Sequence, residues 1–96
     1  MTKSTLSRRA FSDLNKIWQY TFEYWGVDQA DKYVRGLKAA IDSLGENSKL
    51  GHECDYIREG YRKHYCGSHV IFFRISSNNV KIIRILHQKM DIGLHL

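Results

Sequence analysis

The residues best suited to chemistry lie close together late in the sequence. His87, Lys89 and Asp91 form a polar cluster, and His95 follows a few positions later. Histidine exchanges protons near neutral pH, and lysine stabilises the negative charge of a phosphate, so the cluster has the residue types of acid–base chemistry. The same types make hydrogen bonds at the end of a strand. We therefore interpret the cluster as local hydrogen bonding rather than catalysis, and binding to a target stays open.

Two arginines stand inside otherwise apolar runs. Arg74 lies within the run from His69 to Ile75, and Arg84 lies within the run from Val80 to His87. A charge in such a place is costly unless it is paired or reaches solvent. We expect each arginine either to pair with a carboxylate or to point at a ligand, such as an acidic or carbonyl group of a partner segment.

Aromatic residues offer a second kind of candidate, because they dominate the binding energy of many protein interfaces. Trp18 and Trp25 recur with the apolar residues of a helical stripe, which favours packing in the core over contact with a partner. Tyr24 lies off that stripe or at its margin. Tyr24 is therefore the better candidate for an exposed contact.

Neither cysteine nor histidine spacing indicates a metal site. Cys54 and Cys66 form no pair of the zinc-binding type, and we interpret them as reduced, structural thiols. His52, His64 and His69 also lack the spacing of metal ligands. We expect no metal or cofactor.

Size and composition predict one small globular domain over residues 1–96. Hydrophobic residues make up 43% of the 96 residues and charged residues 26%, an ordinary globular mixture. The longest apolar run is far too short to span a bilayer, and the first residues do not form a secretory signal, so we expect a cytoplasmic protein without membrane contact. The net charge of +5 favours an acidic partner. The basic residues are spread along the chain, and we do not expect sequence-specific DNA binding.

Two helices are predicted to position the aromatic residues. Ser7 suits the N-cap of the first helix, and Gly26 suits its end. Asp28 suits the N-cap of a second helix that runs to Leu44, with Val27 as a hydrophobic staple. The short connection predicts an antiparallel hairpin. The apolar stripe of the first helix contains Phe11, Leu14, Ile17, Trp18, Thr21, Phe22 and Trp25.

Three strands are predicted to carry the arginines and the late histidines. The runs 61–65, 69–75 and 80–87 are rich in β-branched and aromatic residues and are separated by short turns. They predict an antiparallel meander with the helical hairpin on one face, an α+β fold. Residues 2–6 are expected to form an edge strand or a frayed end, and residues 45–60 a loop with one turn of helix.

The last strand has apolar residues on both faces. Simple alternation places Val80, Ile82, Arg84 and Leu86 on one face and Lys81, Ile83, Ile85 and His87 on the other. Helices on one side of a sheet need only one apolar face. We therefore expect the second face to meet either the C-terminal tail or a partner chain.

Nearly the whole chain resembles the ParE toxins of bacterial type II toxin–antitoxin modules. The similarity lies in the segments IWQYTFEYWGVDQADKYV from Ile17, GSHVIFFRI from Gly67 and IIRILHQKMD from Ile82. The order and spacing of these segments carry the resemblance. The chain departs from it in having no proline; Arg8 and Ser48 stand near places where family members often have one. Only loop rigidity should differ.

The resemblance implies a toxin that binds DNA gyrase rather than an enzyme. It also implies a ParD-type antitoxin that neutralises the toxin in a hetero-oligomer. The candidates for antitoxin or target contacts are Tyr24, Arg74, Arg84, His87, Lys89, Asp91 and His95.

Two other functions remain open. The related RelE toxins cut mRNA on the ribosome, and this alternative would use Arg62, Arg84, Lys89 and His95. We favour the ParE branch because Met90 and an acid follow Lys89, and no tyrosine follows Tyr65. The remaining alternative is a non-toxic binder that only supports regulation by the antitoxin.

Overall fold

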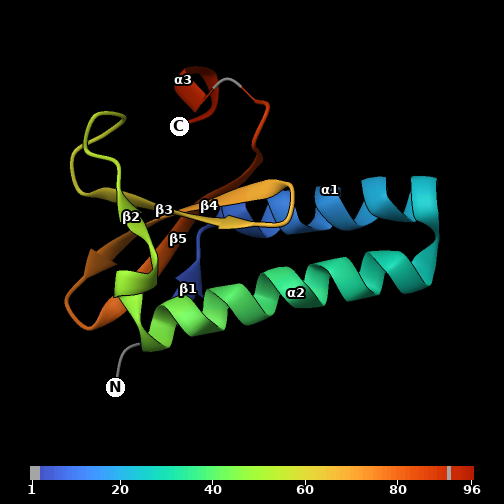
Figure 1. Cartoon of the computed structure of the whole chain (residues 1–96), viewed down its shortest axis with the longest axis horizontal. Helices are drawn as coiled ribbons and strands as arrows, with labels where there is room; N and C mark the ends of the chain where they lie inside the picture. Colours follow the sequence, from blue (N-terminus) through green and yellow to red (C-terminus); the bar gives the residue numbers. More distant parts are fainter. Residues whose placement is uncertain (1–2, 91) are drawn as a thin grey trace.

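A helical hairpin packs against one face of a five-stranded sheet in the computed structural model, which describes residues 3–90 and 92–96 (Figure 1). The strand order in the sheet is β1-β5-β4-β3-β2. The α+β fold predicted from the sequence is confirmed. The elements are β1 (Lys3–Leu6), α1 (Arg8–Trp25), α2 (Val27–Glu46), the 3-10 helix η1 (Ser48–Leu50), β2 (His52–Glu53), β3 (Tyr61–Cys66), β4 (His69–Ser76), β5 (Asn79–His87) and α3 (Ile92–His95).

The hairpin turns on a single glycine. Ser7 caps α1 as predicted, because its hydroxyl oxygen accepts a hydrogen bond from the amide of Ala10 at 3.0 Å. Gly26 ends α1 with a φ of +89°, a backbone conformation that side chains disfavour. This sharp turn lets α2 begin at once at Val27. The predicted N-cap at Asp28 is therefore wrong, and Val27 is 49% exposed rather than a staple.

The sheet contains the predicted meander and two further strands. β3, β4 and β5 pair antiparallel in sequence order. β1 pairs parallel with β5, which confirms the edge-strand alternative for Lys3–Leu6. The predicted loop is more ordered than expected, because α2 runs to Glu46 and β2 adds two residues beside β3. η1 provides the predicted helical turn.

A β-bulge in β5 changes which side chains share a face. Phe72 pairs with Arg84 while Phe73 pairs with Ile82, so Ile83 is an extra residue without a partner in β4. A bulge of this kind shifts the alternation by one position. Our simple alternation is therefore wrong beyond the bulge. Val80, Ile82 and Ile85 pack with the helices, and Ile83 and Leu86 pack on the opposite face.

Each face of the sheet carries its own core. The helix-facing core includes Leu37, Leu44 and Phe73, all fully buried. On the other face, Ile92 and Leu96 of the C-terminal tail pack against a cluster of Cys54, Tyr61, Val70, Phe72 and Leu86. The predicted covering of the second face by the tail is confirmed, and Figure 1 shows α3 on the side of the sheet away from α2. Among the described residues, no helix has the length and apolar character that crossing a bilayer requires.

Candidate functional site

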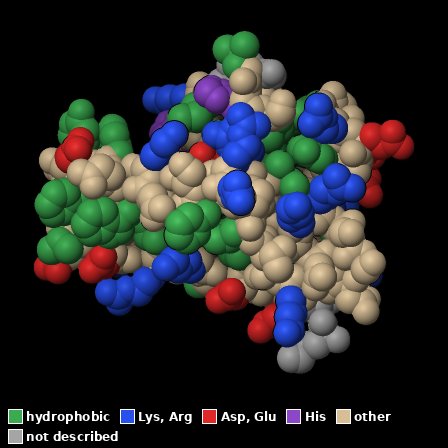
Figure 2. All heavy atoms as spheres, turned by 180° about the vertical axis from the view of Figure 1, so that it is seen from behind, with side chains coloured by type: hydrophobic (Ala, Val, Ile, Leu, Met, Phe, Trp, Pro, Cys, Tyr) green, Lys and Arg blue, Asp and Glu red, His purple; other side chains and the backbone are tan. Residues whose placement is uncertain are grey.

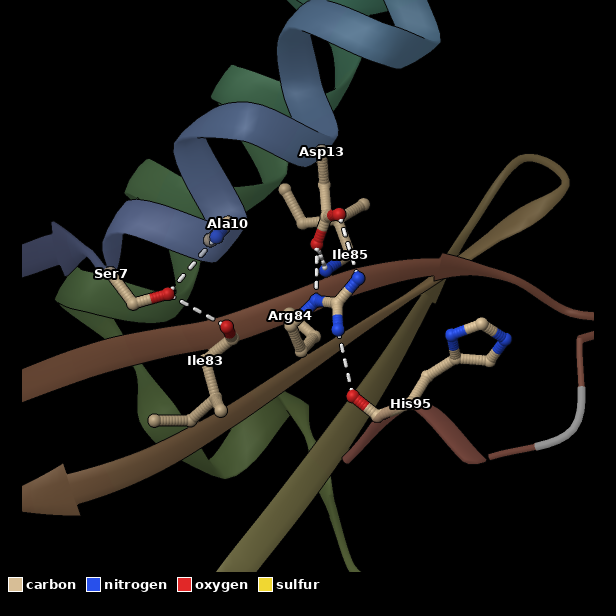
Figure 3. Close-up of polar contacts among 7 residues, drawn as sticks. All are labelled: Ser7, Ala10, Asp13, Ile83, Arg84, Ile85 and His95. Atoms are coloured by element: carbon tan, nitrogen blue, oxygen red, sulfur yellow. Dashed lines mark hydrogen bonds and ion pairs between the residues drawn. The ribbon is translucent and has the colours of Figure 1, made fainter. Parts of the chain in front are cut away.

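Arg84 joins α1, β5 and the C-terminal tail (Figure 3). Its Nε and Nη2 donate to the two carboxylate oxygens of Asp13 at 2.8 and 2.9 Å, and its Nη1 donates to the backbone oxygen of His95 at 2.7 Å. Such a two-pronged contact fixes both side chains in place. We expected Arg84 either to pair with a carboxylate or to point at a ligand, and in the structure it pairs with the carboxylate of Asp13.

This contact also covers the open edge of β5. β1 pairs with β5 only as far as Ile82, so the backbone groups beyond it need other partners. The hydroxyl of Ser7 donates to the oxygen of Ile83 at 2.7 Å, and Asp13 accepts from the amide of Ile85 at 2.9 Å. The start of α1 thus continues the role of β1 along this edge.

The Arg84–Asp13 pair is shielded from water. The side chain of Arg84 is 13% exposed and that of Asp13 is 8% exposed. The hydrogen bond that Arg84 donates to Asp13 raises the pKa of the Arg84 guanidinium above its ordinary value. All three nitrogens of that guanidinium donate to groups of the same chain.

The residues of the proposed nuclease set are only partly brought together. Lys89 is exposed just after β5, and His95 lines a cavity with Arg84. Arg62 instead donates to the oxygen of Gly51 at 2.7 Å and reaches Glu53 at 3.5 Å. Within the described part of the chain, no hydrogen bond or ion pair joins Arg62 to the other three.

The remaining predicted contacts are scattered over the surface. Tyr24 is 65% exposed near the tip of the hairpin, as expected, and its ring centroid lies 4.6 Å from that of Tyr20. Arg74 is exposed on β4, opposite Lys81 of β5. Asp91 lies outside the described residues. These residues do not form one compact site.

Our sequence interpretation assigned Trp18 and Trp25 to the core, and Trp18 does pack, partly buried, against the helix-facing core. The exposed flank of α1 carries an aromatic seam. It consists of Phe11, Trp18, Phe22 and Trp25, at steps of seven, four and three residues. Phe11, Phe22 and Trp25 are 59%, 42% and 64% exposed, so the prediction that Trp25 packs in the core is wrong. Figure 2 shows hydrophobic side chains gathered over the helical hairpin.

A groove between α1 and α2 runs beside the aromatic seam. Its volume is about 410 Å³, and Arg35 and Lys38 stand among its lining residues. The carboxylate of Asp31 in this groove accepts a hydrogen bond from the Trp18 indole at 2.8 Å. The two basic residues outnumber this single carboxylate, so the groove wall carries a net positive charge. An apolar partner with acidic groups fits this surface.

A second cavity, which we call the histidine cleft, lies between α1 and the ends of β4 and β5. Its volume is about 410 Å³, and it is lined by Lys16, Ile17, Tyr20, His69, His87 and Met90. Burial, aided by the nearby imidazole of His87, lowers the pKa of His69 to about 4. His69 is thus neutral at pH 7. No sequence pattern marks this cleft, because its lining residues come from distant segments.

Among residues 3–90 and 92–96, no group of three or more His, Cys, Asp or Glu side chains is placed to hold a metal ion. Cys54 and Cys66 are free, as predicted, and burial raises the pKa of both thiols.

Comparison with known proteins agrees with this architecture. A family model described as "ParE toxin of type II toxin-antitoxin system, parDE" matches residues 5–92. Toxin ParE1 of Mycobacterium tuberculosis (strain CDC 1551 / Oshkosh) is 45% identical over 92 residues, which cover 95% of this chain and 94% of the relative. Toxin ParE1 of Caulobacter vibrioides is 46% identical over 91 residues, with the same two coverages.

Two solved structures share the fold. A chain of the chromosomal ParDE system from P. aeruginosa aligns with a TM-score of 0.79 at 21% identity, covering 91% of this chain and 95% of that one. A chain of the toxin–antitoxin complex RelBE2 from Mycobacterium tuberculosis aligns with a TM-score of 0.60 at 17% identity, covering 91% and 98%. At these identities the alignments describe the path of the chain and not its partners.

Proposed function

The chain belongs to the ParE toxin family of type II toxin–antitoxin systems, and from this premise we propose that it inhibits DNA gyrase and is neutralised by a ParD-type antitoxin. The inhibition acts through protein–protein binding in the cytoplasm. The antitoxin covers apolar surface of the free toxin. The observation that carries this proposal is the exposed aromatic seam.

The aromatic seam has the spacing of a helix-docking surface. Steps of seven, four and three residues keep its members on one side of α1, as in the seam of a coiled coil. Contiguous apolar surface of this kind is typical of a protein interface. Arg35 and Lys38 on the groove wall favour acidic residues on the partner. We infer that an amphipathic antitoxin helix with acidic flanks lies along this groove.

Phe22→Ser tests the antitoxin surface. The ring is 42% exposed and stacks on Trp18 with centroids 5.2 Å apart, so its loss removes partner contacts while leaving most of the core intact. We expect antitoxin affinity to fall by at least about tenfold, the effect of a moderate hot spot. Tyr56→Ser, which alters an aromatic residue that is 76% exposed on another part of the surface, is the matched control. Equal losses in both variants, or none in Phe22→Ser, contradict this placement.

The gyrase contact is proposed to lie at the end of β5 and in the tail. His87, Lys89, Asp91 and His95 are the residues assigned to it. The arrangement of Arg84 supports a binding mode over nuclease chemistry. Arg84 is held by Asp13 and the His95 backbone, so its guanidinium is not free to contact an RNA phosphate.

A supercoiling assay tests the proposed target. Purified gyrase is mixed with the toxin, with and without the cognate antitoxin. We expect inhibition with accumulation of cleaved DNA, and we expect the antitoxin to reverse it. Unimpaired gyrase together with mRNA cleavage on ribosomes would refute the proposal in favour of the RelE-type activity. Lys89→Ala combined with His95→Ala would then be expected to abolish the cleavage.

A further inference from the structure

We propose that the histidine cleft is a second anchoring point for the antitoxin, and that it takes a carboxylate side chain flanked by apolar residues. This inference rests on the proposed function, because it assumes that an antitoxin binds. The cleft is lined by Lys16, His69 and His87 on its polar side. Its remaining lining residues are Ile17, Tyr20 and Met90.

The proton of His69 is fixed by its neighbours. The Tyr33 hydroxyl oxygen accepts from the amide of Ser68 at 3.0 Å and lies 2.6 Å from Nδ1 of His69. Because the hydroxyl already accepts one hydrogen bond, we assign its proton to the contact with Nδ1 of the neutral imidazole, in which Nδ1 accepts. The remaining ring nitrogen, Nε2, therefore carries hydrogen. In this tautomer the Nε2–H group of His69 is a hydrogen-bond donor.

His87 is held in the same tautomer. Its Nδ1 accepts from the amide of Lys89 at 3.1 Å, so the neutral ring also carries its hydrogen on Nε2. The two rings meet edge to face with centroids 5.3 Å apart. Within the described residues, neither Nε2 has a hydrogen-bond partner, and neither is among the buried atoms left unsatisfied. Both therefore remain accessible as donors.

The charge of the histidine cleft favours an anion. Lys16 adds a cationic group to the two imidazole donors, and none of the described residues that line this cavity is acidic. Asp13 lines the adjoining cavity, but its carboxylate is already occupied by Arg84 and the amide of Ile85. Donors of this kind make short, strong hydrogen bonds to a carboxylate.

The shape of the histidine cleft favours a peptide. A cavity of about 410 Å³ with Ile17, Tyr20 and Met90 in its wall exceeds what a carboxylate alone would fill. Apolar neighbours of the carboxylate must occupy the rest. A fourth cavity shares Tyr20, His69 and His87 with the histidine cleft and reaches Trp25 of the aromatic seam. A segment that follows the antitoxin helix can thus enter the cleft without leaving the surface.

Paired peptides test the anion site directly. N-acetyl-Leu-Glu-Phe-amide and N-acetyl-Leu-Gln-Phe-amide differ only in the charge of the central residue. We expect the Glu peptide to bind about tenfold more tightly in NMR titrations, the effect of a charged hydrogen bond. His87→Phe and Lys16→Gln should each remove this preference. His52→Phe and Lys49→Gln, which change exposed residues elsewhere, should keep it.

The cognate antitoxin separates failure of this inference from failure of the proposed function. We expect His87→Phe and Lys16→Gln to weaken antitoxin binding about tenfold. If both bind the antitoxin like the wild type while Phe22→Ser does not, the second anchor is refuted and the aromatic groove stands. If the wild type itself binds no antitoxin, both fail. Lys16 is exposed on α1, so Lys16→Gln decides the question even if His87→Phe does not fold.

Discussion

Removal of the Asp13 carboxylate is expected to destabilise the fold far more than loss of a surface charge. Asp13→Ala deletes two hydrogen bonds from Arg84 and one from the amide of Ile85. The guanidinium, 13% exposed, is then left without its counter-charge. Breaking a buried pair from one side costs about 3–5 kcal/mol. Because Asp13 also satisfies a backbone group, we expect a loss of that size in the free energy of unfolding.

The double variant Asp13→Ala/Arg84→Met separates the stranded charge from the other contributions. Removal of the guanidinium relieves its desolvation, so the double variant should be more stable than Asp13→Ala by at least about 1 kcal/mol. It should still be less stable than the wild type, because the amide of Ile85 stays unsatisfied and the tail loses its contact at the His95 oxygen. Asp42→Ala, an exposed acid on α2, is the control and should change stability by less than about 0.5 kcal/mol.

Urea unfolding followed by circular dichroism measures these differences. The slope of the transition reports whether the unfolded states remain comparable among variants. A loss below about 1 kcal/mol in Asp13→Ala would mean that water already screens the pair. A double variant less stable than the single variant would show that Arg84 contributes chiefly through its packing. Either result refutes the reasoning.

The other predictions concern close packing, pH and one surface arginine. Gly51→Ala places a methyl group against the Phe73 ring and should destabilise the protein by about 1–3 kcal/mol. Gly36 has open space around it, so Gly36→Ala should stabilise α2 by up to about 1 kcal/mol. Urea unfolding measures both changes. The pKa of His69 is about 4 in the folded protein, below its value in the unfolded chain, so the free energy of unfolding decreases as the pH falls. Between about pH 7 and pH 5 this decrease should be about 2 kcal/mol. The unfolding free energy of His69→Phe should lack this pH dependence. Arg74→Ala should leave stability unchanged and weaken antitoxin binding in calorimetry; unaltered affinity would exclude Arg74 from that interface.

The helix ends were predictable where one residue decides them. Ser7 acts through its side chain and Gly26 through its backbone, and both predictions are confirmed. Asp28 shows the limit of such local rules. It has the character of an N-cap, but the turn at Gly26 starts α2 before Asp28 is reached.

The bulge and the aromatic seam were missed for different reasons. Nothing in the sequence around Ile83 marks an extra residue, because the shift appears only when β5 pairs with β4. On α1, two stripes with the same spacing lie side by side, one starting at Ala10 and the other at Phe11. Periodicity alone cannot tell which stripe is buried. The helix-facing core selects the first and leaves the second exposed.

The candidate sites depend on contacts between distant parts of the chain. The sequence indicated that Arg84 needs a partner, but Asp13 lies 71 residues earlier. His69 gained its fixed tautomer from Tyr33, 36 residues away. Residue type thus identified the need for a partner, and only the fold identified the partner.

The parallel pairing of β1 with β5 constrains the order in which the parts of the fold can form during synthesis. Lys3 to Leu6 precede the helical hairpin in the chain, but their neighbours in the sheet are Asn79 to Ile82. Contacts between such distant segments form late and slowly. The helical hairpin can therefore form during translation. The sheet edge and the Arg84 contact can form only after β5 and His95 have been synthesised.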